Sequence, residues 1–360
     1  MEPFLDFLTE IPDKRYGHLL EAWEPEIVDK GNKRELKEIS AFLATFHLKY
    51  ESGLDYTIAL RQGGEIVGTG SFKGEVLRNI AVNEDMQGQG LTAAIVTELM
   101  REQTRRGIVH YFIFTKPDKA FLFSGLGFAE IVRVDPYVAL LETGLGSILN
   151  WCAEARRQLE GLAPGRAALV MNCNPFTKGH EALISRAAAE NESVVVFIVS
   201  EDRSAISFAD RLRLARESIK GLGNVRIIPS GKYMISNATF PTYFLKDEDQ
   251  TIAHTMLDIT LFAEKIAPAL NIVSRYVGEE PTCPVTRAYN EAMLAILPRH
   301  GVEVRVMRRI VAANGELISA STVRDAWPTK DWTRIAAMVP EYTLAYLRSH
   351  ENRFVIKNTD

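Results

Sequence analysis

The sequence is poor in cysteine and lacks an excess of basic residues. Its 360 residues include three cysteines, Cys152, Cys173 and Cys283, and 42 lysines and arginines stand against 46 aspartates and glutamates. Three thiols without metal-ligand spacing indicate neither a disulfide framework nor a zinc site. A formal net charge of -4 argues against nucleic acid as a partner, because a nucleic-acid-binding surface needs clustered positive charge.

Long apolar runs and repeats are lacking as well. No stretch approaches the roughly 20 apolar residues of a membrane span. The first residues, MEPFLDFLTEIPDKR, carry acids where a secretory signal would have a basic region and an apolar core. We find no internal repeat and no low-complexity tract. These absences predict a cytoplasmic protein with no membrane partner. With 46% hydrophobic residues the composition is that of a globular protein, and the length favours two domains.

The first part of the chain mixes helical and strand patterns. Apolar residues recur at helical spacing in KRELKEISAFLATFHL, and two alternating runs flank the pair Gly63 and Gly64 as in a hairpin. The predicted elements are a helix at 33–48, strands at 56–62, 64–72, 76–82 and 110–116, a helix at 91–106 and a last strand within 121–131. This mixture predicts an α+β domain over residues 1–142.

The pattern changes after a helical connector, ILNWCAEARRQLEGL, which ends at Ala163, Pro164 and Gly165. From there, continuous apolar strands alternate with helices: strands at 167–171, 194–200 and 225–230, and helices at 180–190 and 211–220. Such strands are buried on both faces, which predicts a doubly wound α/β domain with a parallel sheet. We therefore predict a linker at 143–165 and a second domain at 166–360.

The stretch NPFTKGH, Asn174 to His180, joins the first of these strands to a helix. At such a junction the first backbone N–H groups are unpaired and the helix dipole is positive, so an anion is stabilised there. Gly179 lets the backbone approach a phosphate closely, while Thr177 would supply a hydroxyl and His180 a switchable cationic donor. Pro175 stiffens the loop. The same residues also fit an ordinary turn with Thr177 as the helix cap.

A second stretch, ISASTVR, presents Ser319, Ser321 and Thr322 beside Arg324. Small hydroxyls at a helix start suit a polyphosphate next to an arginine, because the guanidinium is always charged and forks onto phosphate oxygens. By itself the stretch also fits a serine-capped helix with a solvated arginine.

In this order within an α/β domain, the two stretches resemble the nucleotidylyltransferase superfamily. Its members carry a [T/H]-x-G-H loop after the first strand and an I-S-x-S-x-x-R loop near the end; Asn174 stands where many members have Asp. The resemblance implies ATP with its triphosphate between the loops, attack on the α-phosphorus and release of pyrophosphate, with Mg²⁺ sharing the work through unidentified ligands. We assign catalytic roles to Thr177, Lys178 and His180, and ATP binding to Asn174, Gly179, Ser319, Ser321, Thr322 and Arg324.

The first domain has a candidate anion site of its own, at QGQG between a strand and a helix, where backbone amides could receive a pyrophosphate. Over residues 33–140 the chain resembles the GNAT acetyltransferases, with their [Q/R]-x-x-G-x-[G/A] motif; Thr92 departs from its last position. The resemblance implies binding of a CoA-like group by these residues: Val82, Gln87, Gly88, Gln89 and Gly90.

One departure concerns catalysis by this domain. Many GNAT enzymes place a tyrosine four residues before the Gly of the closing Gly-Phe pair, where it protonates the departing thiolate. Here that position is Phe123, counted back from Gly127. Phenylalanine has no proton to donate, so we expect this domain to dock a thiol cofactor without transferring an acetyl group by itself.

Both halves together, with KYMISNATFPTYFLKD and RYVGEEPTCPVTRAYNEAM, resemble the [citrate (pro-3S)-lyase] ligase family through nearly the whole chain. The resemblance implies an acid–thiol ligase that converts acetate and ATP to acetyl-AMP with release of pyrophosphate. It then acetylates the dephospho-CoA-derived thiol on the acyl carrier subunit of citrate lyase, releasing AMP. A pantetheine-type arm would explain a GNAT-like pocket without a catalytic acid.

Some interpretations stay open. The chain could instead be a nucleotidylyltransferase acting on a phosphorylated metabolite, an acetyl-CoA-dependent N-acetyltransferase, or a nucleotide sensor without catalysis. Single residues are open too: Lys178 (phosphate, acetate or solvent), Tyr233, Phe240 and Tyr243 (substrate pocket or aromatic core), Glu279 and Glu280 (ribose or turn cap), and Cys173 (buried thiol or nucleophile).

Overall fold

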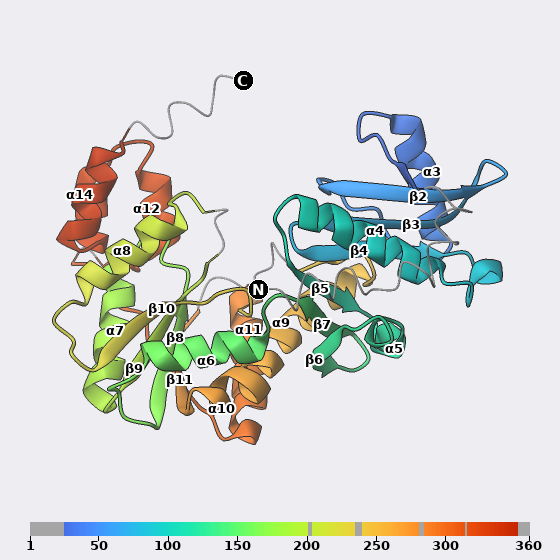
Figure 1. Ribbon diagram of the computed structural model, residues 1–360. Coiled ribbons are helices and arrows are strands. Elements are labelled where there is room, and N and C mark those ends of the chain that lie inside the picture. Colours follow the sequence, from blue (N-terminus) through green and yellow to red (C-terminus); the bar gives the residue numbers. More distant parts are fainter. Residues whose placement is uncertain (1–24, 201–203, 235–239, 281–283, 314, 352–360) are drawn as a thin grey trace. The chain divides into compact units, whose positions relative to one another are not determined.

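The computed structural model describes residues 25–200, 204–234, 240–280, 284–313 and 315–351, and the chain divides into two compact units (Figure 1). The first unit consists of Met1–Ser147 and Phe240–Ala253, and the second of Ile148–Thr239 and His254–Asp360. None of the helices in the described ranges has the length and hydropathy that a membrane span requires.

The first unit is built on a seven-stranded mixed sheet with the order β1-β2-β3-β4-β5-β7-β6. Strands β4 and β5 run parallel, and every other neighbouring pair is antiparallel. Its strands are β1 (Pro25–Ile27), β2 (Tyr56–Gln62), β3 (Glu65–Lys73), β4 (Val76–Val82), β5 (His110–Thr115), β6 (Ala129–Val134) and β7 (Val138–Gly144). Its helices are α3 (Lys33–Ala44), η1 (Glu84–Met86), α4 (Leu91–Arg105), η2 (Pro117–Lys119), α5 (Ala120–Ser124) and η3 (Asp247–Asp249).

Helix α4 lies close against strands β3 and β4 because small residues lie beneath it. A Cβ atom added to Gly70 of β3 would be 2.4 Å from Cγ2 of Ile95, which is fully buried together with Leu99. Only glycine leaves room for this approach. The packing fixes the start of α4 and the preceding Gly88–Gly90 turn at the carboxyl end of β4.

The parallel pairing of β4 and β5 is short, and a segment from much later in the sequence lies beside these strands. It covers only two residue pairs, Val76 with Phe112 and Leu77 with Ile113. The segment Phe240–Ala253 lies beside these strands: the Tyr243 hydroxyl donates to the Phe114 carbonyl over 3.5 Å, and Tyr243 accepts from the Lys49 backbone N–H over 2.8 Å. This segment therefore belongs to the first unit, although it lies about 100 residues after Ser147 in the sequence.

The second unit contains a five-stranded, fully parallel sheet with the order β10-β9-β8-β11-β12. Its strands are β8 (Arg166–Met171), β9 (Val194–Ile198), β10 (Val225–Pro229), β11 (Ile272–Gly278) and β12 (Glu303–Met307). The order reverses between β8 and β11, and in such sheets ligands bind outside the carboxyl ends of the strands at this switch point.

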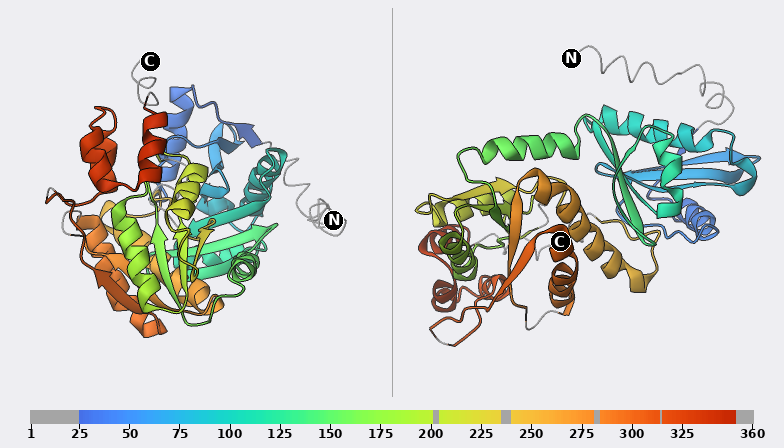
Figure 2. Two further views of the ribbon diagram at one scale, coloured as in Figure 1. Left: turned by 90° about the vertical axis from the view of Figure 1, so that its left-hand side faces the viewer. Right: turned by 90° about the horizontal axis from the view of Figure 1, so that it is seen from below.

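Helices cover both faces of this sheet. In the left view of Figure 2 the helices α7 and α8 lie in front of the parallel strands, and with α12 to α14 they enclose the larger core on that face. Helix α6 contacts β10 and α10 contacts β11. The helices are α6 (Ile148–Gln158), α7 (Lys178–Glu190), α8 (Phe208–Ser218), α9 (Gln250–Leu261), the π-helical turn η4 (Phe262–Ile266), α10 (Ala267–Ala269), α11 (Pro284–Ile296), η5 (Leu297–His300), α12 (Ala320–Ala326), α13 (Trp332–Met338) and α14 (Glu341–Ser349).

The predicted fold class is confirmed in its architecture: an α+β unit with a mixed sheet is followed by a doubly wound parallel sheet. The boundaries differ in two places. Helix α6, predicted as a linker, packs within the second unit, where the Trp151 ring lies 6.2 Å from that of Phe197 and 5.8 Å from that of Tyr233. Residues 240–253, assigned to the second domain, belong to the first unit, because their hydrogen bonds are made with residues 49 to 114.

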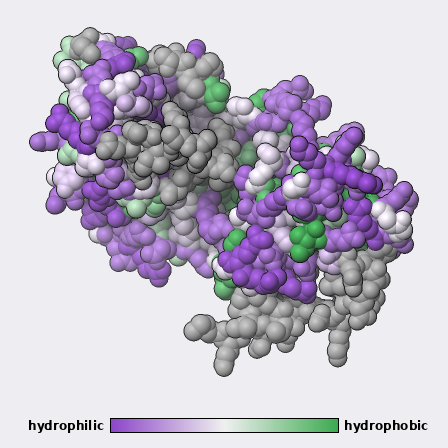
Figure 3. Space-filling model, turned by 90° about the horizontal axis from the view of Figure 1, so that it is seen from above, coloured by the Kyte–Doolittle hydropathy of each residue, from purple (hydrophilic) through white to green (hydrophobic). Residues whose placement is uncertain are grey.

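The described surface is largely hydrophilic on the face drawn in Figure 3. Hydrophobic residues form small, separate patches there among hydrophilic ones, as on most folded proteins.

Candidate functional site

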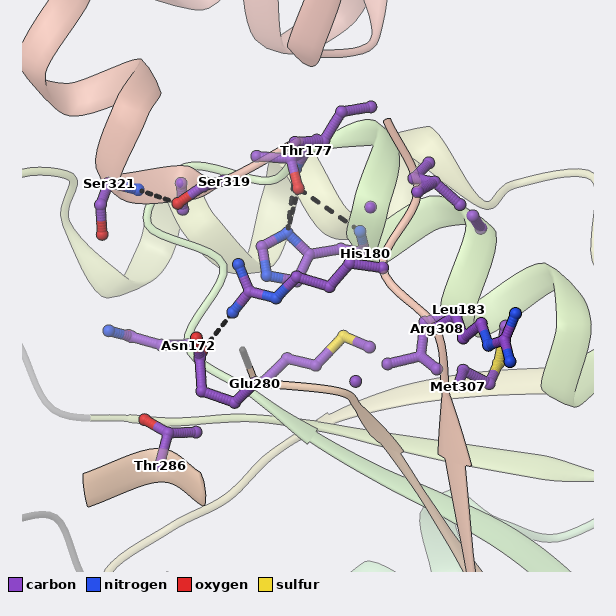
Figure 4. A pocket seen from close by; sticks show the side chains of 18 of the residues that line it. Asn172, Thr177, His180, Leu183, Glu280, Thr286, Met307, Arg308, Ser319 and Ser321 are labelled. Carbon is purple, nitrogen blue, oxygen red and sulfur yellow. Dashed lines mark hydrogen bonds and ion pairs between the residues drawn. The ribbon is translucent and has the colours of Figure 1, made fainter. Parts of the chain in front are cut away.

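A cavity of about 350 Å³ opens at the carboxyl ends of β8, β11 and β12 in the second unit. The starts of helices α7 and α12 border it, and Figure 4 shows Thr177 and His180 of the first and Ser319 and Ser321 of the second at this cavity. Its walls are formed by Val170, Met171, Asn172, Thr177, Gly179, His180, Ala182, Leu183, Gly278, Glu280, Thr286, Met307, Arg308, Arg309, Ile310, Ile318, Ser319, Ala320 and Ser321. The two widely separated sequence stretches thus meet at one cavity.

Thr177 and His180 form a reciprocal cap at the start of α7. The Thr177 Oγ1 atom accepts from the His180 backbone N–H over 3.4 Å, and His180 Nδ1 accepts from the Thr177 backbone N–H over 3.0 Å (Figure 4). The two side chains also lie 2.9 Å apart. The capping role and the position at the cavity, which the sequence left as alternatives, therefore occur together.

This geometry determines the protonation of His180. Because Nδ1 accepts a backbone N–H, the proton of the neutral ring is on Nε2, which we infer from the hydrogen bonds. Burial, and next the positive charge of Arg309, lower the pKa of His180 to about 4. The expected switchable cation is thus corrected: near neutral pH His180 is an uncharged N–H donor, because burial and the charge of Arg309 disfavour the protonated ring.

The second loop approaches the first closely. Ser319 caps α12 by accepting from the Ser321 backbone N–H over 3.2 Å. A Cβ on Gly179 would lie 3.6 Å from Cγ2 of Ile318, so the loops are in contact at this glycine. Arg324 joins them: its guanidinium donates to the Asn174 carbonyl over 2.6 Å and to Ser321 Oγ over 3.0 Å.

Four predicted residues do not line the cavity. The Lys178 ammonium donates to the carbonyls of Ala336 and Ala337 in α13 over 2.9 and 3.2 Å, so it is bonded away from the cavity, and its catalytic role stays a prediction. The Asn174 side chain accepts from the Ile206 backbone N–H over 3.2 Å. Neither Thr322 nor Arg324 is among the wall residues, and Arg324 links the loops instead of projecting into the cavity.

Sequence reasoning missed the arginines that follow β12. Arg308 is exposed at the cavity, while Arg309 donates to the Glu279 carbonyl over 2.9 Å and forms an ion pair with buried Glu280. Two adjacent arginines directly after an apolar strand, in EVRVMRR, were the available signal, because the carboxyl ends of parallel strands meet at one edge.

Buried Arg211 of α8 was also missed, and it positions this edge of the sheet. It donates to the Val199 carbonyl over 2.8 Å and to the Asn172 carbonyl over 2.7 Å, and another bond reaches Asn172 Oδ1 over 2.8 Å. The residues that follow β8 and β9 are thereby held together beside the cavity.

Comparisons with known proteins agree with this architecture. A family model described as "Citrate lyase ligase C-terminal domain" matches residues 166–347. A [citrate [pro-3S]-lyase] ligase of Klebsiella pneumoniae is 38% identical over 323 residues, covering 88% of this chain and 93% of the relative. The chain belongs to the citrate lyase ligase family. A second ligase of this family, from Haemophilus influenzae, is 36% identical over 88% of this chain and 96% of its own.

Solved structures give weaker likenesses to parts of this ligase-family chain. Thermotoga maritima TmcAL, bound with alpha-thio ATP, has a TM-score of 0.34 and 12% identity, covering 52% of this chain and 56% of its own. The ribosomal-protein-S18-alanine N-acetyltransferase of Escherichia coli has a TM-score of 0.29 and 18% identity, covering 34% of this chain and 95% of its own.

The turn predicted to hold a CoA-like group in this ligase-family chain leads directly into α4. Gly88 and Gly90 have φ angles of 78° and 83°, which glycine adopts without strain, and Gln87 and Gln89 are exposed. Helix α4 has no side-chain cap, so its first backbone N–H groups are left for water or a ligand. Val82 ends β4 and is buried.

The aromatic candidates of the sequence analysis are buried in the folded chain. Phe123 is buried in the first unit and meets the Phe128 ring edge-on at 6.4 Å. Tyr233, Phe240 and Tyr243 are likewise buried, and burial raises the pKa of Tyr243.

The cysteines show no sign of activation. Burial raises the pKa of Cys173, and it raises that of Cys152 to about 11, so both thiols are protonated near neutral pH. Cys283 lies outside the described residues. Within the described part of the chain, no group of three or more His, Cys, Asp or Glu side chains could hold a metal ion.

Proposed function

We propose that this chain activates acetate with ATP and transfers the acetyl group to the thiol of the citrate lyase acyl carrier subunit. The observation that carries the proposal is the meeting of the Thr177–His180 turn and the Ser319–Ser321 loop at one cavity, in a chain of the citrate lyase ligase family. Neutral and charged donors surround the cavity, as a triphosphate requires.

In the first step a carboxylate oxygen of acetate attacks the α-phosphorus of ATP. The new bond joins this oxygen to phosphorus, the bond to the bridging oxygen breaks, and pyrophosphate leaves with the electron pair. The protein needs no covalent chemistry here; it aligns the reactants and stabilises the added negative charge. The donors that we assign to this task are His180 Nε2–H, the hydroxyls of Ser319 and Ser321, and the guanidinium groups of Arg308 and Arg309.

Magnesium enters this proposal as a companion of the nucleotide. Mg²⁺ usually keeps several waters and is held by substrate phosphates with one or two carboxylates. Glu280 is the buried carboxylate at the cavity, and Arg309 already forms an ion pair with it. The described residues thus fit a metal that is held mainly by ATP. When bound, it would neutralise part of the phosphate charge.

In the second step the carrier thiol attacks the acetyl carbon of acetyl-AMP. The sulfur–carbon bond forms, the bond from carbon to the phosphate oxygen breaks, AMP leaves, and the thiol proton passes to solvent. We assign the Gln87–Gly90 turn and the start of α4 to holding the phosphate end of the carrier's prosthetic group. The buried Phe123 supplies no acid, so this unit acts as a docking module.

The decisive experiment supplies ATP, acetate and deacetylated carrier to the full-length protein. We expect AMP and pyrophosphate to appear only with acetate, and citrate cleavage to return in the same tube. A requirement for a phosphorylated acceptor would instead identify a nucleotidylyltransferase. Acetylation from acetyl-CoA without ATP would identify an acetyltransferase, and ATP binding without AMP formation would identify a sensor.

A further inference from the structure

A second cavity, of about 280 Å³, lies beside the nucleotide cavity within the second unit. The two share Val170 of β8 and Thr286 of α11 as wall residues. The nucleotide cavity lies toward α7, whereas the second cavity is bordered by residues of α9, β11 and α11. A small molecule in the second cavity would therefore be a direct neighbour of a nucleotide in the first.

The guanidinium of Arg275 is the unusual feature of this second cavity. Arg275 is only 4% exposed, and neither its Nε nor its Nη1 atom has a hydrogen-bond partner. The flat group lies over the Phe262 ring at 4.4 Å, on the π-helical turn that follows α9. Burying unsatisfied charged donors is costly, and π-helical turns are frequent at functional sites.

The second cavity has further polar groups beside Arg275, and Tyr289 interacts with it. The Tyr289 hydroxyl donates to the carboxylate of Asp258, and His254 also lines the wall. Among the described residues, no ion pair joins Arg275 to Asp258 or to any other carboxylate. Burial raises the pKa of Tyr289 and the Asp258 charge acts in the same direction, while the charge of Arg275 and its hydrogen bond to Tyr289 act against them. Burial has the largest effect, so this hydroxyl stays protonated as a donor to Asp258.

These surroundings select a small monoanion with an apolar end. A charged guanidinium with two N–H sites that lack a partner suits a carboxylate, which binds arginine through strong charge-assisted hydrogen bonds. The nearby Asp258 carboxylate repels a phosphate dianion more strongly than a monoanion. Val170, Val199 and Met234 supply an apolar wall for a short alkyl group.

We propose that Arg275 binds the carboxylate of the acid substrate in this second cavity, an inference that rests on the proposed function. Arg275 lies opposite Ala168 in the pairing of β11 with β8, and β8 leads into the loop that carries Thr177. The sheet thus connects the carboxylate site and the nucleotide site through neighbouring strands. Arg275 is a substrate-binding residue, and its fork orients the attacking oxygen toward the adjacent nucleotide.

The test compares Arg275→Met with Arg166→Met. Arg166 is a buried arginine of the same sheet, at the start of β8, and it donates to the carbonyls of Leu270 and Leu162; it lines neither cavity. For Arg275→Met we expect the KM for acetate to rise about 10- to 100-fold, as for a lost hydrogen bond to a charged group, with the KM for ATP changed less than about twofold. Arg166→Met should lose stability without this change in the KM for acetate.

Arg275→Lys keeps the charge but not the fork and serves if the methionine variant fails to fold; the KM for acetate should still rise severalfold. An unchanged KM for acetate in a folded Arg275 variant would overturn the proposal, as would an equal rise for ATP and acetate.

A calorimetric titration of the full chain with acetate separates this proposal from the proposed function. If the wild-type protein binds acetate, Arg275→Met does not, and no AMP forms, then the carboxylate site stands and the proposed reaction is wrong. If AMP formation depends on acetate and the variant titrates like the wild type, the reaction stands and the carboxylate site is wrong.

Discussion

Replacing His180 separates its role in the helix cap from its proposed role as a donor to ATP. Asn offers an oxygen where histidine has Nδ1, so His180→Asn can still accept from the Thr177 backbone N–H, but it has no group in the place of Nε2–H. His180→Ala loses both contacts. The two variants therefore differ in the cap and agree in the missing donor.

The magnitudes follow from these contacts. Loss of a donor that stabilises transition-state charge costs about 3–4 kcal/mol, or roughly 10²–10³ in rate. Loss of a helix cap costs about 1 kcal/mol of folding free energy. We expect both variants to lose about 10²–10³ in acetate-dependent AMP formation, and only His180→Ala to lose measurable stability.

Two measurements check these outcomes: AMP release in a single turnover gives the rate, and urea unfolding gives the stability. Wild-type turnover in a folded His180→Asn variant would refute the assignment of Nε2–H to the phosphates.

The low pKa of His180 also predicts how the folding stability depends on pH. Its pKa of about 4 in the folded chain lies below the usual value of about 6.5 in an unfolded chain. Between these values the unfolded chain binds more protons, so stability is fully present above pH 6.5 and is lost as the pH falls toward 4. His180→Asn should flatten this dependence, up to about 3 kcal/mol at the acid end, which urea unfolding at pH 7.5 and pH 5 would detect. An equal pH dependence in the variant would contradict the neutral ring.

Three other substitutions test the remaining assignments. Arg324→Gln removes the link to the Asn174 carbonyl, and we expect the KM for ATP to rise about tenfold because a charged hydrogen bond is lost; a normal KM would show that the loops meet without it. Lys178→Met should lower the midpoint of urea unfolding and change turnover less than tenfold, since its ammonium bonds to α13; a 100-fold loss of turnover would restore its predicted catalytic role. Gly90→Val is strained at a φ of 83° and should raise the carrier concentration needed for half-maximal rate with the KM for ATP unchanged, whereas a change in the KM for ATP alone would place the thiol arm elsewhere.

Local rules were sufficient for much of the fold. The run AALVM and the stretch TKGH predict a strand, a turn and a helix start because burial on both faces and capping act between near neighbours in the chain. Phe123 was likewise identified locally, by counting back from Gly127 to the position where many GNAT enzymes have a tyrosine.

Other features depended on contacts between distant residues. In the sequence, residues 240–253 come after the strands and helices of the α/β pattern. Nothing local indicates that the Thr242 backbone N–H donates to the Glu51 carboxylate over 3.1 Å. The roles of Lys178 and Arg308 could not be predicted from the sequence either. Whether a cationic side chain reaches the cavity depends on which acceptors the folded chain places around it.

The sequence by itself determined that two loops of the second unit lead into capped helices with the residue pattern of a predicted anion site, because caps, glycines and strand–loop–helix order are properties of short stretches. Only the tertiary structure decided which side chains reach the cavity and that Arg275 lies buried beside it with two N–H sites that lack a partner. Those outcomes depend on the order of the parallel strands, which brings the end of β8 beside the ends of β11 and β12, more than 100 residues further along the chain.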